Sequence, residues 1–155
     1  MERSEFERLL ADCELFRGLG KSDIGEIASL CHLETHGAGE KVFSQGDFGE
    51  NLYVIAEGHV VLERSVDLGT RKGSAVIGML GKGRAFGCWS TLLDEAHTLM
   101  STATCQKLTK VVVLNGAELR DMMLSNTELG FNVLQRLCFL LRDRIQGVFG
   151  AMEKI

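Results

Sequence analysis

Residues 39–47 read GEKVFSQGD and residues 52–60 read LYVIAEGHV, and these two runs decide the fold class. Each combines β-branched or aromatic residues with a glycine near its end, which is typical of a short strand followed by a turn. Similar runs recur at residues 75–77 and 111–114, again with glycine between them. Short strands at nearly regular spacing are typical of a sandwich, barrel or jelly roll. We therefore expect a mainly β fold here.

The sequence on both sides of this β-rich region changes to a helical period. Residues 4–7 have the S-x-x-E form of a capping box, and a second short helix is expected to start near Ser22. From Ala117 the apolar spacing is helical to the end of the chain. We expect one domain, residues 1–155, with N-terminal helices in 1–32, a β region in 33–115 and C-terminal helices in 116–155.

The last helix carries a narrow apolar seam. Its steps alternate between three and four residues, a strict heptad pattern, whereas a helix that covers its own domain usually shows a broader stripe. The seam consists of Phe131, Leu134, Cys138, Leu141, Ile145, Val148, Met152 and Ile155. The simplest partner is the same helix of a second copy, so the pattern predicts a homodimer. The alternative is a helix that only caps its own domain.

Bulk composition excludes several classes of protein. The chain has 155 residues, 45% of them hydrophobic, and a net charge of −4, as in a soluble globular domain. Its basic residues are scattered, which argues against general binding of nucleic acid through the phosphates. No apolar run reaches the roughly 18 residues of a membrane span, and the charged N-terminus is not a secretory signal. We therefore expect a cytoplasmic protein with no membrane partner.

Reactive motifs are also missing from the sequence. We find no G-x-S-x-G, H-E-x-x-H or Walker-type phosphate loop, so we expect no enzyme. The five cysteines contain no C-x-x-C pair and are interpreted as small buried hydrophobic residues. Cys31, His32 and His36 lie close in sequence, but a zinc site needs a fourth ligand that nothing supplies. No metal is expected.

The two runs quoted first resemble the opening strands of the cyclic-nucleotide-binding domain. That domain is shared by catabolite-activator-type regulators, kinase regulatory subunits and nucleotide-gated channels, and its pattern is G-E-x-[IVL]-[IF]-x-x-G-D, then L-[YF]-x-[IVL]-x-x-G-x-[VAL]. Residues 80–87, LGKGRAFG, resemble the family's lead into its phosphate-binding cassette. The resemblance starts near Phe16 and implies a β-roll (a double-stranded β-helix or jelly roll) with N-terminal helices and a long C-terminal dimerisation helix. It also implies a ligand-sensing regulatory domain for signal transduction.

The cassette, residues 86–104 in this chain, departs from the family pattern. The family reads F-G-E-x-A-L, then a short helix, then R-[TSA]-A-[TS]; its Glu takes the ribose 2′-hydroxyl and its Arg pairs with the cyclic phosphate. Cys88 stands in place of that Glu, and Ser101 stands in place of that Arg. An unpaired phosphate in a half-buried pocket costs roughly 3–5 kcal/mol, a hundred- to several-thousand-fold in affinity. We expect cyclic-nucleotide binding to be weakened, or replaced by another small anionic effector.

Several residues of the cassette remain candidates for a ligand. A short helix should offer backbone N–H groups, hydroxyl groups can donate hydrogen bonds, and an indole can stack. The candidates are Phe86, Gly87, Cys88, Trp89, Ser90, Thr91, Ser101 and Thr102. The alternative is that these residues only close the roll, with Trp89 as packing.

Two other functions stay open at this stage. The chain is a ligand-free dimerisation scaffold if Trp89 and Met100 fill the pocket. It is a haem or thiol redox sensor if His59, His97 or Cys88 holds haem, or if Cys88 is reactive. The chain reaches Ile155 without the helix-turn-helix of the related regulators, so we expect no direct nucleic-acid binding. It is either a stand-alone sensor or one part of a longer protein.

Overall fold

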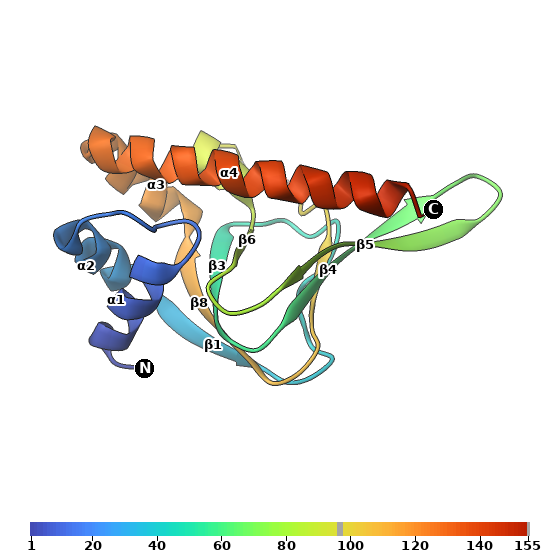
Figure 1. Cartoon of the computed structure of the whole chain (residues 1–155), viewed down its shortest axis with the longest axis horizontal. Helices are drawn as coiled ribbons and strands as arrows, with labels where there is room; N and C mark the ends of the chain where they lie inside the picture. The colour runs from blue at the N-terminus through green and yellow to red at the C-terminus, as the bar shows by residue number, and fades with distance from the viewer. Residues whose placement is uncertain (96–97, 155) are drawn as a thin grey trace.

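The computed structural model describes residues 1–95 and 98–154. Two helices, eight strands with a 3₁₀ helix, and two further helices follow one another in these residues (Figure 1). In chain order they are α1 (Arg3–Asp12), α2 (Lys21–Ser29), β1 (His32–His36), β2 (Lys41–Phe43), β3 (Asn51–Glu57), β4 (Val60–Asp67), β5 (Lys72–Leu80), β6 (Ala85–Gly87), η1 (Trp89–Leu93), β7 (Thr102–Cys105), β8 (Thr109–Asn115), α3 (Gly116–Ser125) and α4 (Thr127–Met152).

The strands form two four-stranded antiparallel sheets. One has the order β1-β8-β3-β6 and the other β2-β7-β4-β5, so apart from the hairpin of β4 and β5 the neighbours come from distant parts of the sequence. The interior of the roll holds three aromatic rings, those of Phe43, Tyr53 and Phe86, whose centroids lie 5.1–5.8 Å apart. The predicted mainly β roll with flanking helices is confirmed.

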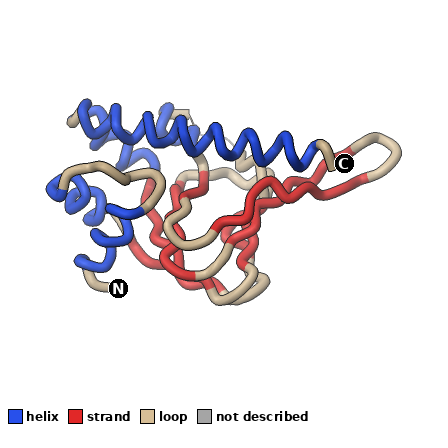
Figure 2. Tube along the Cα trace, viewed as in Figure 1, coloured by secondary structure: helices blue, strands red, loops and turns tan. Residues whose placement is uncertain are grey.

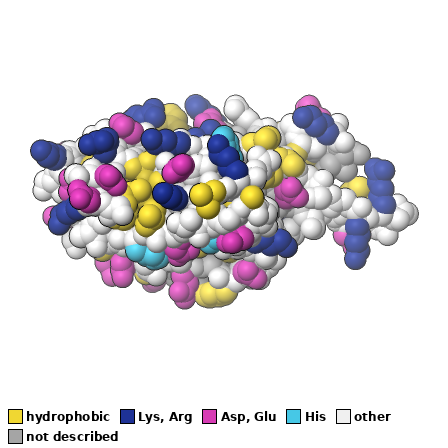
Figure 3. Space-filling view, turned by 90° about the horizontal axis from the view of Figure 1, so that it is seen from below, with side chains coloured by type: hydrophobic (Ala, Val, Ile, Leu, Met, Phe, Trp, Pro, Cys, Tyr) yellow, Lys and Arg dark blue, Asp and Glu magenta, His cyan; other side chains and the backbone are white. Residues whose placement is uncertain are grey.

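The helices gather at one end of the roll and along one side (Figure 2). Their buried side chains share a second core with the outer side of β3 and β8. Leu10 and Ile27 bring α1 and α2 into this core, and Leu129 and Leu140 bring α4. None of the helices in the described part of the chain is long and apolar enough to cross a membrane. Figure 3 shows a face on which basic and acidic side chains are interspersed.

One glycine of α4 marks a close crossing between this helix and strand β5. A side chain at Gly147 would place its Cβ 2.7 Å from the carbonyl oxygen of Ile77. From the sequence, glycine at this position weakens the helix. In the structure it lets the backbone of α4 approach the sheet, so the cost in helix propensity is offset by packing. Beyond this crossing, β4 and β5 continue as a hairpin that projects from the roll (Figure 1).

Candidate ligand site and helix surface

The start of the cassette is fixed by a close backbone approach. Strand β6 pairs with β3, with Leu52 opposite Gly87. Gly87 has φ +133°, and a Cβ there would lie 2.5 Å from the carbonyl oxygen of Asn51. Only glycine fits this position without strain. Gly87 therefore allows the end of β6, which leads into η1, to pair closely with β3.

The body of the cassette is attached directly to α3. Thr91, in η1, lies against Gly116 at the start of α3 so closely that a Cβ on Gly116 would overlap it. Arg120 Nη1 donates to the carbonyl oxygen of Leu92 at 3.2 Å. At the far end of α3, the side chain of Asn126 caps α4 by accepting a hydrogen bond from the backbone N–H of Leu129. The short helix η1 is therefore in direct contact with α3, which leads into α4.

Most of the predicted ligand residues have structural partners. Phe86 and Cys88 are buried in the interior of the roll, Cys88 with 3% exposure. The Thr91 hydroxyl donates to the Cys88 carbonyl at 2.8 Å, and the Thr102 hydroxyl accepts from the backbone N–H of Gln45 at 2.9 Å. Ser90 is buried, whereas Ser101 is half-buried at the rim. Thr102 next to it is half-buried as well.

Trp89 does not face the ring cluster of the roll. It is half-buried and packs against the core shared with the helices, which favours the packing interpretation over ligand stacking. Met100 is 65% exposed. The prediction that Trp89 and Met100 fill the pocket is therefore wrong. The space is filled by the aromatic rings of Phe43, Tyr53 and Phe86, because inward-facing positions of three different strands converge there.

A hollow of about 300 Å³ opens beside the ring cluster. Tyr53 and Leu99 line its apolar part, and Asp47 and Glu50 line its polar part. Among the described residues that line it, none is basic. A neighbouring hollow of about 270 Å³ shares Glu50 and adds the carboxyl groups of Asp94 and Glu95. This side of the cassette therefore disfavours a phosphate group.

Two arginines that sequence reasoning missed donate to carbonyl groups of the cassette. Arg64, on β4, donates from Nη1 to the carbonyl oxygen of Met100. Arg120, on α3, donates to that of Leu92, as described above. The alternation of β4 residues could have placed Arg64 on a face, but its neighbour across the sheet depends on the register with β7.

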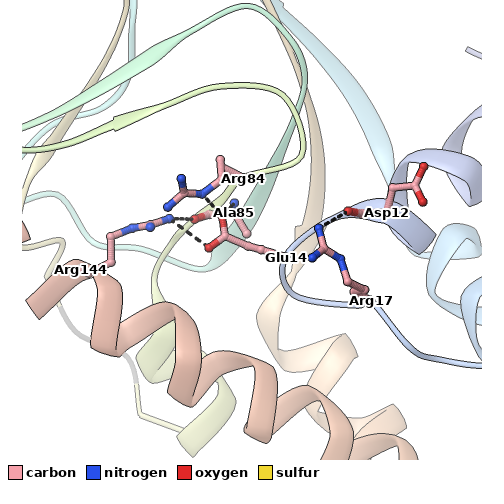
Figure 4. A network of polar contacts seen from close by, with 6 residues as sticks. All are labelled: Asp12, Glu14, Arg17, Arg84, Ala85 and Arg144. Atoms are coloured by element: carbon pink, nitrogen blue, oxygen red, sulfur yellow. Dashed lines mark hydrogen bonds and ion pairs between the residues drawn. The ribbon is translucent and has the colours of Figure 1, made fainter. Parts of the chain in front are cut away.

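A network of polar contacts joins the N-terminal segment, β6 and α4 (Figure 4). Glu14 Oε2 accepts from Arg84 Nε at 2.6 Å and from the backbone N–H of Ala85 at 3.0 Å. Arg144, on α4, donates to the Ala85 carbonyl oxygen at 2.6 Å and lies 3.5 Å from Glu14 Oε1. Burial lowers the pKa of Arg144, and Glu14 opposes that shift. These contacts fix α4 to the strand that enters the cassette.

Most of the predicted seam of α4 is exposed, although Leu141 packs against the core of its own domain. Phe131, Ile145 and Met152 are 66%, 52% and 61% exposed. Leu134 and Cys138 are also exposed, Leu141 and Val148 are half-buried, and Ile155 lies outside the described residues. The buried face of the same helix consists of other residues, namely Leu129, Val133, Leu137, Leu140 and Ala151. The helix therefore has two apolar faces, and its own domain covers one of them.

The thiol and haem alternatives find little support in the described residues. Cys88 is too buried to act as an accessible sensor thiol. Burial raises the pKa of Cys13 to about 11 and that of Cys31 to about 12, so both remain protonated at neutral pH. His59 is exposed, and His97 lies outside the described residues. Within residues 1–95 and 98–154, no three His, Cys, Asp or Glu side chains are placed to hold a metal ion together.

Comparisons with known proteins agree with this architecture. Residues 33–126 match the family described as "Cyclic nucleotide-binding domain". The chain is 31% identical over 85 residues to a cAMP-dependent protein kinase regulatory subunit from Mycosarcoma maydis, covering 55% of this chain and 15% of that protein. It is 34% identical over 92 residues to the Cyclic AMP receptor protein of Thermus thermophilus, covering 59% of this chain and 41% of that protein. It therefore spans less than half the length of either relative.

A solved structure extends the likeness to the whole fold. The crystal structure of a cyclic nucleotide-binding domain from Methylobacillus flagellatus superposes with a TM-score of 0.79 at 21% sequence identity. The superposition covers 99% of this chain and 84% of that chain. At this level of identity it supports the fold, including the long C-terminal helix.

Proposed function

Because this chain belongs to the cyclic nucleotide-binding domain family, we propose that it is a ligand-sensing regulatory domain that dimerises through α4. Its effector is a cyclic nucleotide held weakly, or another small anionic molecule. We propose that residues 1–155 act as one domain without catalytic activity, in the cytoplasm. The observation that carries the proposal is the cassette itself: it is attached to α3 and α4, yet it has Cys88 and Ser101 at the two positions that grip the nucleotide in the family.

The route from ligand to helix follows contacts already described. A ligand at the rim of the roll would press on η1, which Thr91 and Arg120 connect to α3. A movement of β6 would reach α4 through Glu14 and Arg144. A ligand shifts this equilibrium only by its difference in affinity for the two arrangements. We infer that the output is the position of α4 in the dimer.

Cyclic AMP is expected to bind the purified chain weakly, with a dissociation constant above about 0.1 mM. The reason is the missing charge-assisted bond between an arginine and the phosphate, together with the acidic side chains beside the cassette. A calorimetric or chemical-shift titration measures this directly. Micromolar binding by the unmodified chain would contradict the weakened cassette.

The matched variant for this titration is Ser101→Arg. Ser101 is half-buried, so part of its surface is open to a longer side chain. The new guanidinium is expected to tighten cyclic AMP binding by about 10- to 100-fold. Cys88→Glu is a poorer choice, because Leu99 and Gly49 crowd the buried Cys88.

Oxidation is expected to cross-link two copies of the chain through Cys138. This residue lies at the middle of the exposed seam, and in a parallel, in-register pair of helices it meets its own copy. Cys13, Cys88 and Cys105 are buried, and the half-buried Cys31 has a pKa raised to about 12, so Cys138 is the exposed and reactive thiol. Mild oxidation followed by non-reducing electrophoresis should give a dimer band that Cys138→Ser abolishes. A dimer in solution without this band would exclude the parallel arrangement.

The filled interior of the roll favours a second candidate, a ligand-free dimerisation scaffold. The ring cluster of Phe43, Tyr53 and Phe86 occupies space that an open pocket would need. This candidate predicts the same dimer, but no binding of cyclic AMP by either the unmodified chain or Ser101→Arg. The two titrations therefore separate the two functions.

A further inference from the structure

We propose that Arg64 supplies, from strand β4, the cation for the ligand's anionic group that Ser101 does not supply from the cassette. The inference rests on the proposed function, namely that the roll senses a small molecule. It names the class of ligand as one with a phosphate or similar anionic group, and it assigns the residue that recognises that group.

Strand β4 directs Arg64 toward the inside of the roll. Side chains alternate between the two faces of a strand, and Val60 and Leu62 of β4 lie in the interior core. The register between β4 and β5 shifts at Leu62, whereas the register between β4 and β7 does not shift there. The extra residue of this bulge therefore lies in β5. The alternation along β4 is therefore unbroken. Arg64 shares the inward face of Leu62 at the point where the strand reaches the rim.

The pairing of β4 with β7 leads Arg64 to the end of the cassette at which Ser101 lies. Leu62 pairs with Ala103 and Glu63 with Thr102, the last step of the ladder, and the same register continued by one residue would set Arg64 next to Ser101. Ala103 lies in the interior core, so Ser101 lies on the same face. The hydrogen bond from Arg64 Nη1 to the Met100 carbonyl oxygen places the guanidinium at this end of the cassette.

The charge of Arg64 is available to a ligand. Within the described part of the chain, its guanidinium forms no ion pair with a carboxylate. The adjacent Glu63 belongs to the other face of β4, where its Oε2 accepts a hydrogen bond from the Ser74 hydroxyl. A guanidinium has five N–H donors, and the hydrogen bond from Nη1 to the Met100 carbonyl oxygen leaves others for a ligand. Because Arg64 is exposed, we expect a moderate contribution.

The test is a titration of cyclic AMP at low salt into the unmodified chain and into Arg64→Gln. The substitution is expected to weaken binding by about 10-fold. Adenosine lacks the phosphate, so its affinity should be unchanged. The matched control is Arg71→Gln, an exposed arginine between β4 and β5 and farther out on the hairpin, which should leave both affinities unchanged. An unfolding temperature equal to that of the unmodified chain verifies the fold.

Three results would overturn the assignment of Arg64. One is equal affinity of Arg64→Gln and the unmodified chain for cyclic AMP. Another is an equal loss for adenosine, which would mean that Arg64 acts on the shape of the site. The third is no binding of cyclic AMP by the unmodified chain at about 10 mM. In that case Ser101→Arg distinguishes failure of the Arg64 assignment from failure of the proposed function. Binding of cyclic AMP by this variant would keep the ligand-sensing function, and no binding would contradict that function too.

Discussion

Ile145→Asp is expected to raise the dissociation constant of the α4-mediated dimer by about a thousandfold or more. In the isolated chain Ile145 is 52% exposed on the free face of α4, so the substitution leaves the buried face of the helix intact. In the dimer, each copy would place an unpaired carboxylate in an apolar seam. Burying an unpaired charge costs several kcal/mol, and about 4 kcal/mol corresponds to a thousandfold.

Sedimentation equilibrium over a range of concentrations measures this constant. The control is Gln146→Asp, which adds the same charge one position away, outside the seam and in an exposed position. It should leave the dimer unchanged within about threefold. Both variants should stay folded as monomers, because neither position belongs to the buried face of α4. A dimer that survives Ile145→Asp would show that another surface holds the copies together.

The heptad pattern selected residues of α4 that are mostly exposed in the structure, and the dimer it predicts stays a prediction. The seam from Phe131 to Met152 repeats every 3.5 residues on average, whereas the buried face follows the path of α4 over its own domain. The first strands and their glycines likewise predicted the roll, because local strand and turn signals agree there with the final topology.

The ligand site could be predicted only in part, since its chemistry depends on pairing between distant segments. The loss of the family's Arg is visible at Ser101 in the sequence. That Arg64 reaches the Met100 carbonyl oxygen depends on the register of β4 and β7, which no local pattern fixes. Trp89 packs against the core shared with the helices. The interior of the roll is also apolar, so the residue type alone does not indicate which of the two the indole contacts.

The contact between Glu14 and Arg144 could not be predicted from the sequence. Glu14 lies in the loop after α1. Its partner Arg84 lies immediately before β6, and its partner Arg144 lies on α4. Charged residues in such positions usually remain in solvent, so the sequence predicts nothing special for them. Only the folded arrangement brings two guanidinium groups to one carboxylate beside the entry of the cassette (Figure 4).

Gly87→Ala is expected to lower the free energy of unfolding by about 3–5 kcal/mol. Two costs add at this position. The backbone has φ +133°, which L-residues rarely adopt, and the new Cβ would lie 2.5 Å from the Asn51 carbonyl oxygen. That neighbour is backbone within a sheet, so it cannot rotate away as a side chain would. Relief requires β6 to separate from β3, which would also displace the entry of the cassette.

Two other glycines separate these costs in urea denaturation. Gly83→Ala tests the backbone conformation alone, because Gly83 has φ +84° with nothing within 4 Å of a new Cβ, and it should cost about 1–2 kcal/mol. Gly73→Ala meets neither obstacle and should change stability by about 0.5 kcal/mol at most. The order Gly87, Gly83, Gly73 follows only if the contact with Asn51 is rigid. Equal losses at Gly87 and Gly83 would mean that β6 yields easily, and a cassette so loosely held could not transmit ligand binding to α4.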